Sequence, residues 1–162
     1  MTPTQVRASV VAERVAWVRQ MVSRTRSLPL DSLETFLADS RNAGAAESYL
    51  RRGIEALLDI GRHILAKGFA VAASEYKEIG PRLVENGVLG REDGLLLRRI
   101  AGYRNRMVHF YSEVGAEELY SLCTTHVADL ERLCDAFVDW LRRNPDKLDR
   151  NCFYRENTPP SP

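Results

Sequence analysis

The chain has 162 residues, of which 44% are hydrophobic and 28% charged, proportions typical of one folded globular domain and not of a disordered or fibrous chain. The formal net charge of +1 excludes a strongly basic protein, although local clusters of arginine can still form a surface for nucleic acid. No apolar run approaches the roughly 18 residues of a membrane-spanning helix and the N-terminus lacks a signal-peptide pattern, so we expect a cytoplasmic protein without a membrane segment.

The N-terminal part predicts one long helix followed by one short helix. Over residues 4–26 the apolar side chains recur at helical spacing, at Val11, Val15, Val18 and Val22. Leu28-Pro29-Leu30 ends this pattern, and Asp31-Ser32-Leu33-Glu34 has the spacing of a capping box. We therefore expect an amphipathic helix, then a helix of about two turns, and then a turn at residues 40–42.

A second long helix is predicted over residues 43–67. Gly53 and Gly61 lower its helix propensity but allow another helix to approach closely. We interpret His63 as an exposed or hydrogen-bonded residue of this helix and not as a catalytic one. The same helix carries a group of arginines, namely Arg51, Arg52 and Arg62.

Three more helices are predicted over residues 74–86, 92–108 and 116–144, the first with an interruption or kink at Gly80-Pro81. No stretch alternates like a strand, so the fold class is all-α, an up-and-down bundle of four or five principal helices. We expect one helical domain over residues 1–144 and an irregular C-terminal tail over residues 145–162.

The cysteines lie at irregular spacing, at Cys123, Cys134 and Cys152. This pattern indicates neither a disulfide framework nor a zinc site. The first two fall within the helical pattern of residues 116–144, so we expect them to be small core residues.

The stretch from Tyr103 to Tyr111 concentrates the side chains that can do chemistry. As a helix it has an apolar stripe that faces the core, formed by Leu96, Ile100, Tyr103, Met107 and Phe110. The polar residues Arg104, Asn105 and His109 are expected on the side turned away from the core. On a straight helix Arg104 and His109 are about 140° apart, so they converge on one phosphate only if the helix end bends or a second subunit supplies a partner.

Arg104 and His109 together suffice for cleavage of RNA without a metal ion. An arginine is a permanent cation with planar donors that suit phosphate, and a histidine exchanges a proton near neutral pH. The ribose 2′-OH would attack the adjacent phosphorus, His109 would move a proton, and Arg104 would stabilise charge on the phosphoryl oxygens. One chain offers only one motif histidine, so we expect a twofold dimer in which two motif helices form one cleft.

A structural role for the same residues stays open on the sequence alone. Cationic side chains near a helix end also cap its C-terminus and compensate the helix dipole. Three roles stay open for Tyr111: a site residue, a residue that forms a hydrogen bond at an interface, or an aromatic residue at the edge of the core. A purely structural dimerisation bundle is therefore one alternative to a nuclease.

The segment Arg104-Asn105-Arg106-Met107-Val108-His109-Phe110-Tyr111 resembles the Arg-x4-His-x-Tyr motif of the HepT-like HEPN ribonucleases. These are the toxin half of toxin–antitoxin pairs with a minimal nucleotidyltransferase. Residues 49–66 are similar to the helix that precedes the motif in that family, and Glu75-Tyr76-Lys77-Glu78 and Leu119-Tyr120 also fit. The resemblance covers roughly residues 44–140.

This resemblance implies an all-α HEPN bundle, a homodimer with a composite cleft and metal-independent endoribonuclease activity on RNA, with no cofactor. It implies that Arg104 and His109 are the catalytic pair and that Asn105 is the polar residue that often follows the arginine. Arg106 is expected to bind phosphate or support the site. Tyr111 matches the tyrosine to which the nucleotidyltransferase antitoxin adds AMP, and phosphates there would compete with RNA for Arg104.

A non-catalytic HEPN module that binds a nucleotide or docks a nucleotidyltransferase is the main alternative within this family. Such a module would have less need of His109. The family tends to have a capping residue where this chain has Gly115, a departure that affects a helix cap and not the site. The N-terminal helix and the tail have no confident match in the family.

Overall fold

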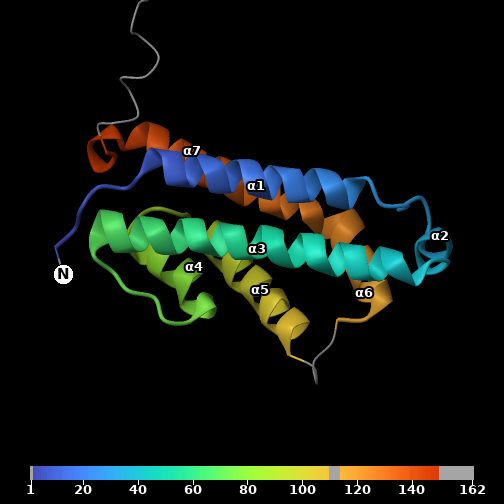
Figure 1. Ribbon diagram of the computed structural model, residues 1–162. Coiled ribbons are helices and arrows are strands. Elements are labelled where there is room, and N and C mark those ends of the chain that lie inside the picture. The colour runs from blue at the N-terminus through green and yellow to red at the C-terminus, as the bar shows by residue number, and fades with distance from the viewer. Residues whose placement is uncertain (1, 110–113, 150–162) are drawn as a thin grey trace, which may run out of the picture.

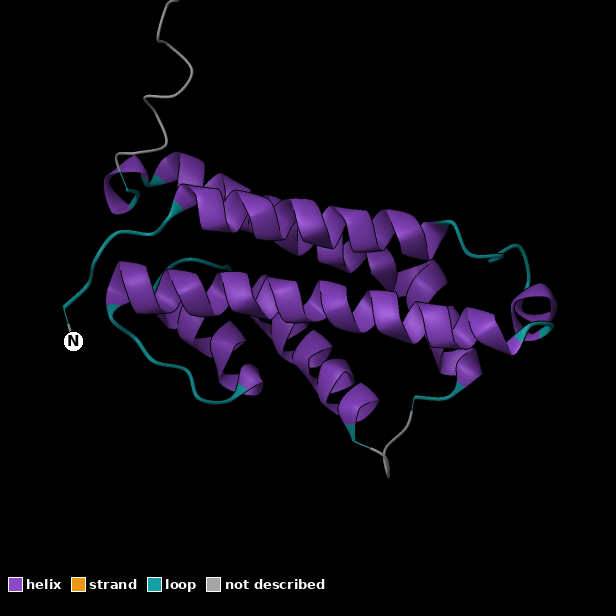
Figure 2. Ribbon diagram, in the orientation of Figure 1, coloured by secondary structure: helices purple, strands orange, loops and turns teal. Residues whose placement is uncertain are grey.

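The computed structural model describes residues 2–109 and 114–149, and Figure 2 shows that helices make up nearly all of their regular structure. In chain order these are α1 (Ala8–Arg26), α2 (Leu33–Leu37), α3 (Ser40–Phe69), α4 (Tyr76–Glu85), α5 (Arg91–Val108), α6 (Ala116–Ser121), the π-helical turn η2 (Leu122–His126), α7 (Val127–Arg143) and the 3-10 helix η3 (Pro145–Lys147). The predicted all-α bundle is confirmed. Within the described ranges, no helix is long and apolar enough to cross a membrane.

The longest helix, α3, is the central element of the bundle (Figure 1). α1 and α7 pack on one side of it, and α4 and α5 lie on the other side. α2 and α6 close the end of the bundle at which α3 begins. The C-terminal end of α5, which carries the predicted site, lies at the margin of the bundle, where α5 runs away from α3 (Figure 1).

The main core lies where α1, α3, α4, α5 and α7 meet. The predicted stripe of α1 is fully inside it, with the buried residues Val11, Val15, Val18 and Val22. A Cβ atom added to Gly61 would lie 2.7 Å from Cγ2 of Ile79 on α4. One added to Gly53 would lie 3.2 Å from Cδ2 of Leu130 on α7. The prediction that these two glycines admit neighbouring helices is thus confirmed.

A smaller second core fills the end of the bundle formed by α2, the start of α3, α6 and η2. Its buried residues are Phe36, Ala46, Leu50, Leu119, Leu122 and Cys123. Tyr103 and Met107 of α5 pack against it. The last turns of α5 therefore contact the second core through Tyr103 and Met107, with Tyr103 also packed against the main core, while the first turns belong to the main core.

The start of α3 differs from the prediction. The turn expected at residues 40–42 is wrong, because Ser40 is already the first helical residue. The side chain of Asp39 caps the helix by accepting the N–H of Arg41 at 3.0 Å. Asn42 donates its side-chain amide to the carbonyl of Phe36 at 3.0 Å. These polar side chains satisfy backbone groups at the helix start, and the same residue types led us to predict a turn.

The interruption predicted at Gly80-Pro81 is also wrong, since α4 runs through both residues. Pro81 lacks the N–H that would bond to the preceding turn, which costs local helix stability. Ile79 and Leu83 on either side of it are fully buried against the core. Gly80 lies so close to α5 that an added Cβ would be 2.4 Å from the carbonyl oxygen of Gly94. Packing on α3 and α5 therefore outweighs the local preference.

The chain after α7 stays packed on the bundle as far as Asp149. Leu148 is buried and forms an isolated parallel bridge with Val6. Val6 donates to the carbonyl of Lys147 and accepts the N–H of Asp149, both at 2.9 Å. Residues 145–149 were expected in the irregular tail, but burial of Leu148 keeps them in the packed domain. Residues 150–162 lie outside the described part.

His63 is a hydrogen-bonded helix residue, as interpreted from the sequence. Its Nε2 accepts the N–H of Arg7, the N-cap residue of α1, at 3.1 Å. Burial of the ring lowers its pKa from the ordinary value of 6.5, and the charges of Lys67, Arg14 and Arg7 lower it further. The neutral ring therefore joins the start of α1 to α3.

Cys123 and Cys134 are both buried, which confirms them as core residues. Burial raises the pKa of each thiol to about 12. Neither group is therefore a reactive thiolate near neutral pH. Cys152 lies outside the described residues.

Candidate functional site

The predicted site begins where α5 ends. The core-facing stripe of the helix is buried or half-buried as predicted, at Leu96, Ile100, Tyr103 and Met107. The helix stops at Val108, and His109 has extended backbone angles of φ −96° and ψ 122°. The chain thus leaves the helical path at His109, which is one of the two conditions for Arg104 and His109 to converge. Phe110 lies outside the described residues.

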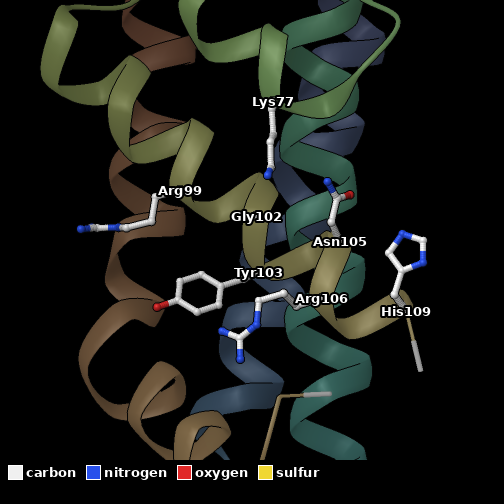
Figure 3. A pocket seen from close by; sticks show the side chains of 7 residues that line it. All are labelled: Lys77, Arg99, Gly102, Tyr103, Asn105, Arg106 and His109. Carbon is white, nitrogen blue, oxygen red and sulfur yellow. The ribbon is translucent and has the colours of Figure 1, made fainter. Parts of the chain in front are cut away.

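A pocket of about 390 Å³ opens beside this helix end, a size within the range of small-ligand sites (Figure 3). Lys77 enters it from α4, and the other lining residues come from α5 and its C-cap, namely Arg99, Gly102, Tyr103, Asn105, Arg106 and His109. In the view of Figure 3 the amide of Asn105 lies between the ammonium group of Lys77 and the ring of His109. The pocket therefore combines cations, an amide and an imidazole, a set of groups suited to binding an anion and moving a proton.

Arg104 does not line this pocket, and its side chain contacts α3 and α4. Its Nε donates to Oε1 of Glu55 at 3.1 Å, and its Nη2 lies 3.1 Å from the same oxygen. Its Cζ lies 4.6 Å from the centre of the Tyr76 ring, a cation–π contact. We expected Arg104 on the side of α5 that faces solvent, but its side chain is only 20% exposed. The carboxylate of Glu55 and the ring of Tyr76 account for this difference.

Arg106 makes a two-pronged ion pair with Glu118 of α6. Nη1 and Nη2 of Arg106 lie 2.6 and 2.8 Å from the two carboxylate oxygens. These hydrogen bonds raise the pKa of Arg106 and lower the pKa of Glu118. The pair joins the end of α5 to α6, which flank residues 110–113 in the chain.

Of the predicted site residues, Asn105, Arg106 and His109 share one pocket, and Arg104 occupies a neighbouring cluster with Glu55 and Tyr76. Tyr111 lies outside the described residues. Within residues 2–109 and 114–149, no three His, Cys, Asp or Glu side chains come together in a group suited to a metal ion.

Comparison with known proteins identifies the family of the chain. A family model described as ribonuclease HepT-like matches residues 18–137, which is most of the chain. The chain belongs to the HepT-like family. No curated protein sequence matches it significantly.

Solved structures share the fold of this HepT-like chain. A tri-AMPylated HEPN toxin of Shewanella oneidensis in complex with the MNT antitoxin is 21% identical, over 80% of this chain and 97% of the toxin, with a TM-score of 0.73. A toxin–antitoxin complex with AMP-PNP is 19% identical over 81% and 98% of the two chains, with a TM-score of 0.73. The cytosolic protein YutE of Bacillus subtilis, of unknown function, is 20% identical over 90% and 98%, with a TM-score of 0.72.

The sequence interpretation did not identify the side chains that surround the HepT-like motif, namely Glu55, Tyr76, Lys77 and Glu118. Glu55 follows Arg51 by four residues, and the two side chains approach to 3.5 Å, a helix pair that the sequence does indicate. Its contact with Arg104 joins residues far apart in the chain, and no local pattern predicts such a contact. Tyr76 and Lys77 lie in a segment that resembles the family, but their contacts with α5 depend on the packing of α4.

Proposed function

We propose that this HepT-like protein is a cytoplasmic, metal-independent endoribonuclease and the toxin of a toxin–antitoxin pair. The observation that carries the proposal is the arrangement at the end of α5. There His109 and Asn105 line a pocket next to Arg104, within a chain that belongs to a family of HepT-like ribonucleases. These residues supply a proton carrier and a phosphate-binding cation at one end of one helix.

In the proposed reaction the ribose 2′-oxygen attacks the adjacent phosphorus while the bond from phosphorus to the 5′-oxygen breaks. The products are a 2′,3′-cyclic phosphate and a 5′-hydroxyl end. His109 takes the proton of the 2′-OH or gives a proton to the departing oxygen. Arg104 donates hydrogen bonds to the phosphoryl oxygens, on which negative charge increases in the transition state.

The proposed reaction needs both a base and an acid, which favours a homodimer with a composite cleft. Two α5 ends related by a twofold axis would bring two copies of His109 and two of Arg104 together. The placement of Arg104 outside the pocket of its own chain supports this arrangement. Light scattering together with activity at several protein concentrations tests it, and a fully active monomer contradicts it.

Cleavage by purified protein in excess EDTA tests the proposal directly. We expect the unmodified chain to cut single-stranded RNA, and we expect His109→Ala and Arg104→Ala to lose most of this activity. His126→Ala, a change at a histidine of η2 that does not line the pocket, serves as the matched control. If the unmodified chain binds RNA or nucleotide but never cuts, the protein is instead a non-catalytic binding module.

We propose further that a partner nucleotidyltransferase neutralises the toxin by adding AMP to Tyr111. The support is the motif position of Tyr111 and the AMPylated state of the similar Shewanella oneidensis toxin in its antitoxin complex. Mass spectrometry after co-expression with a candidate antitoxin tests this step, with Tyr111→Phe as the control. An inactive complex that carries no adduct on Tyr111 contradicts it.

A further inference from the structure

Two arginines from different helices share one aromatic ring beside the candidate site. Cζ of Arg104 on α5 lies 4.6 Å from the centre of the Tyr76 ring, and Cζ of Arg62 on α3 lies 4.8 Å from the same centre. The two guanidinium groups are thus no farther apart than the sum of these distances. Arg62 belongs to the arginine group on α3 that the proposed reaction leaves without a role.

The charges in this cluster do not balance. Glu55 is ion-paired with Arg104 at 3.1 Å and with Arg51 at 3.5 Å. Among the ion pairs between described residues none includes Arg62, and its Nε is buried without a hydrogen-bond partner. Three arginines against one carboxylate leave the cluster with two excess positive charges.

Such a cluster is suited to an anion. The Tyr76 ring offsets part of the repulsion between the guanidinium groups through its electron-rich face, but it supplies no hydrogen-bond acceptor to the donors that point away from it. Glu55 accepts a hydrogen bond from Nε of Arg104, one of the five N–H donors that an arginine has. Phosphate oxygens match the planar donor forks that remain.

We propose that Arg62 binds the backbone phosphate next to the one that is cleaved, while Arg104 binds the reacting phosphate. Tyr76 fixes the spacing of the two guanidinium groups from α4. The proposal rests on RNA as the substrate and adds a second phosphate subsite to it. Arginines interleaved with aromatic rings are a common means of holding a single strand along its backbone. Arg62 is then a binding residue that makes no contact with the reacting atoms.

Binding is measured apart from cleavage by using a labelled single-stranded RNA in which every 2′-OH is methylated and so cannot attack. For Arg62→Ala we expect the Kd to rise about tenfold, the loss of one charge-assisted contact. The slope of log K against log salt should become shallower by about 0.7, the change for one phosphate of a single strand. Arg62→Lys should recover part of the affinity because it retains the charge.

Arg24→Ala is the matched control, because Arg24 is an exposed arginine on α1, across α3 from α4. We expect it to bind RNA as the parent does. Thermal unfolding of each variant tests whether its fold is intact. With cleavable RNA, Arg62→Ala should raise KM much more than it lowers kcat, whereas a change at a reacting group lowers kcat.

Substitution of Tyr76 tests the subsite a second time without altering any charge. Tyr76→Phe keeps the ring and should retain more RNA affinity than Tyr76→Leu, which should weaken binding to the level of Arg62→Ala. Equal affinity of Arg62→Ala and Arg24→Ala for the methylated RNA overturns the subsite, even if His109→Ala confirms the nuclease. A parent that binds the RNA through Arg62 but never cuts it leaves the subsite standing and refutes the nuclease. Loss of AMP binding in Arg62→Ala with unchanged RNA binding also overturns the subsite, in favour of a nucleotide site.

Discussion

Glu55 holds Arg104 through one carboxylate oxygen, which lies 3.1 Å from both Nε and Nη2 of the arginine. The remaining donors of Arg104 stay available to a phosphate, and the Tyr76 ring limits the movement of the side chain. Glu55 is thus a positioning residue for the arginine on which the proposed reaction depends. In the proposed reaction it would also compete with RNA for the same cation.

These two effects of Glu55 predict opposite changes in rate and binding. Glu55→Ala should lower kcat about tenfold because Arg104 loses its orientation, and it should lower KM because a competing charge is removed. Glu55→Gln should keep most of the rate, since its amide oxygen accepts the same hydrogen bonds. Glu47→Ala, on the same helix, is the control. A KM that rises in Glu55→Ala would show that the carboxylate does not compete with RNA.

The pair formed by Arg106 and Glu118 predicts that the two residues act together. If Arg106 supports the site by joining α5 to α6, then Arg106→Ala and Glu118→Ala should reduce cleavage by similar factors. The double variant should be no worse than either single variant. Cleavage rates of the three variants form the test. An Arg106→Ala variant that loses RNA affinity while Glu118→Ala keeps it would instead assign Arg106 to phosphate binding.

The close contact of α4 and α5 predicts that Gly80 tolerates no side chain. An added Cβ would lie 2.4 Å from the backbone oxygen of Gly94, so the helices must move apart. Gly80→Ala should lower the free energy of unfolding by about 1 to 3 kcal/mol. Gly44 has open space around it within α3, and Gly44→Ala should raise the same free energy by about 0.5 to 1 kcal/mol. Unfolding in urea measures the free energy of unfolding of both variants. Equal changes in Gly80→Ala and Gly44→Ala would contradict the prediction.

The hydrogen bond from Arg7 to His63 predicts a dependence of stability on pH. The pKa of His63 is lower in the folded protein than its ordinary value of 6.5, so the unfolded chain takes up the proton first as the pH falls. The contribution of the neutral His63 ring to the free energy of unfolding is fully present above pH 6.5. It is lost as the pH falls through the lowered pKa of the folded protein. His63→Gln should weaken this dependence. Unfolding at several pH values tests the slope, and an NMR titration that places His63 above 6.5 contradicts the prediction.

The fold was predictable wherever an apolar pattern decided the structure. The valine stripe of α1 and the apolar stripe of α5 identified both helices and the faces that they bury. Two differences from the prediction arise where tertiary contacts outweigh local preference. Pro81 stays helical because its neighbours are buried, and residues 145–149 stay packed because Leu148 is buried.

The site was predictable only as a set of residue types on one helix. The pattern placed Arg104, Asn105 and His109 on the side turned away from the core, and Asn105 and His109 line the pocket. It misplaced Arg104, because the orientation of that side chain depends on Glu55 and Tyr76 from two other helices. Long-range partners of this kind leave no periodic signal in a single sequence.

The second core has a consequence for motion. It is much smaller than the main core, yet it anchors the last turns of α5 through Tyr103 and Met107. Local opening costs less free energy where fewer apolar side chains are buried. Amide hydrogens near Asn105 should therefore exchange with solvent through sub-global opening, ahead of those near Leu97. Substitutions of Phe36, which is remote from the motif in sequence, would then alter the fraction of molecules in which the end of α5 is folded.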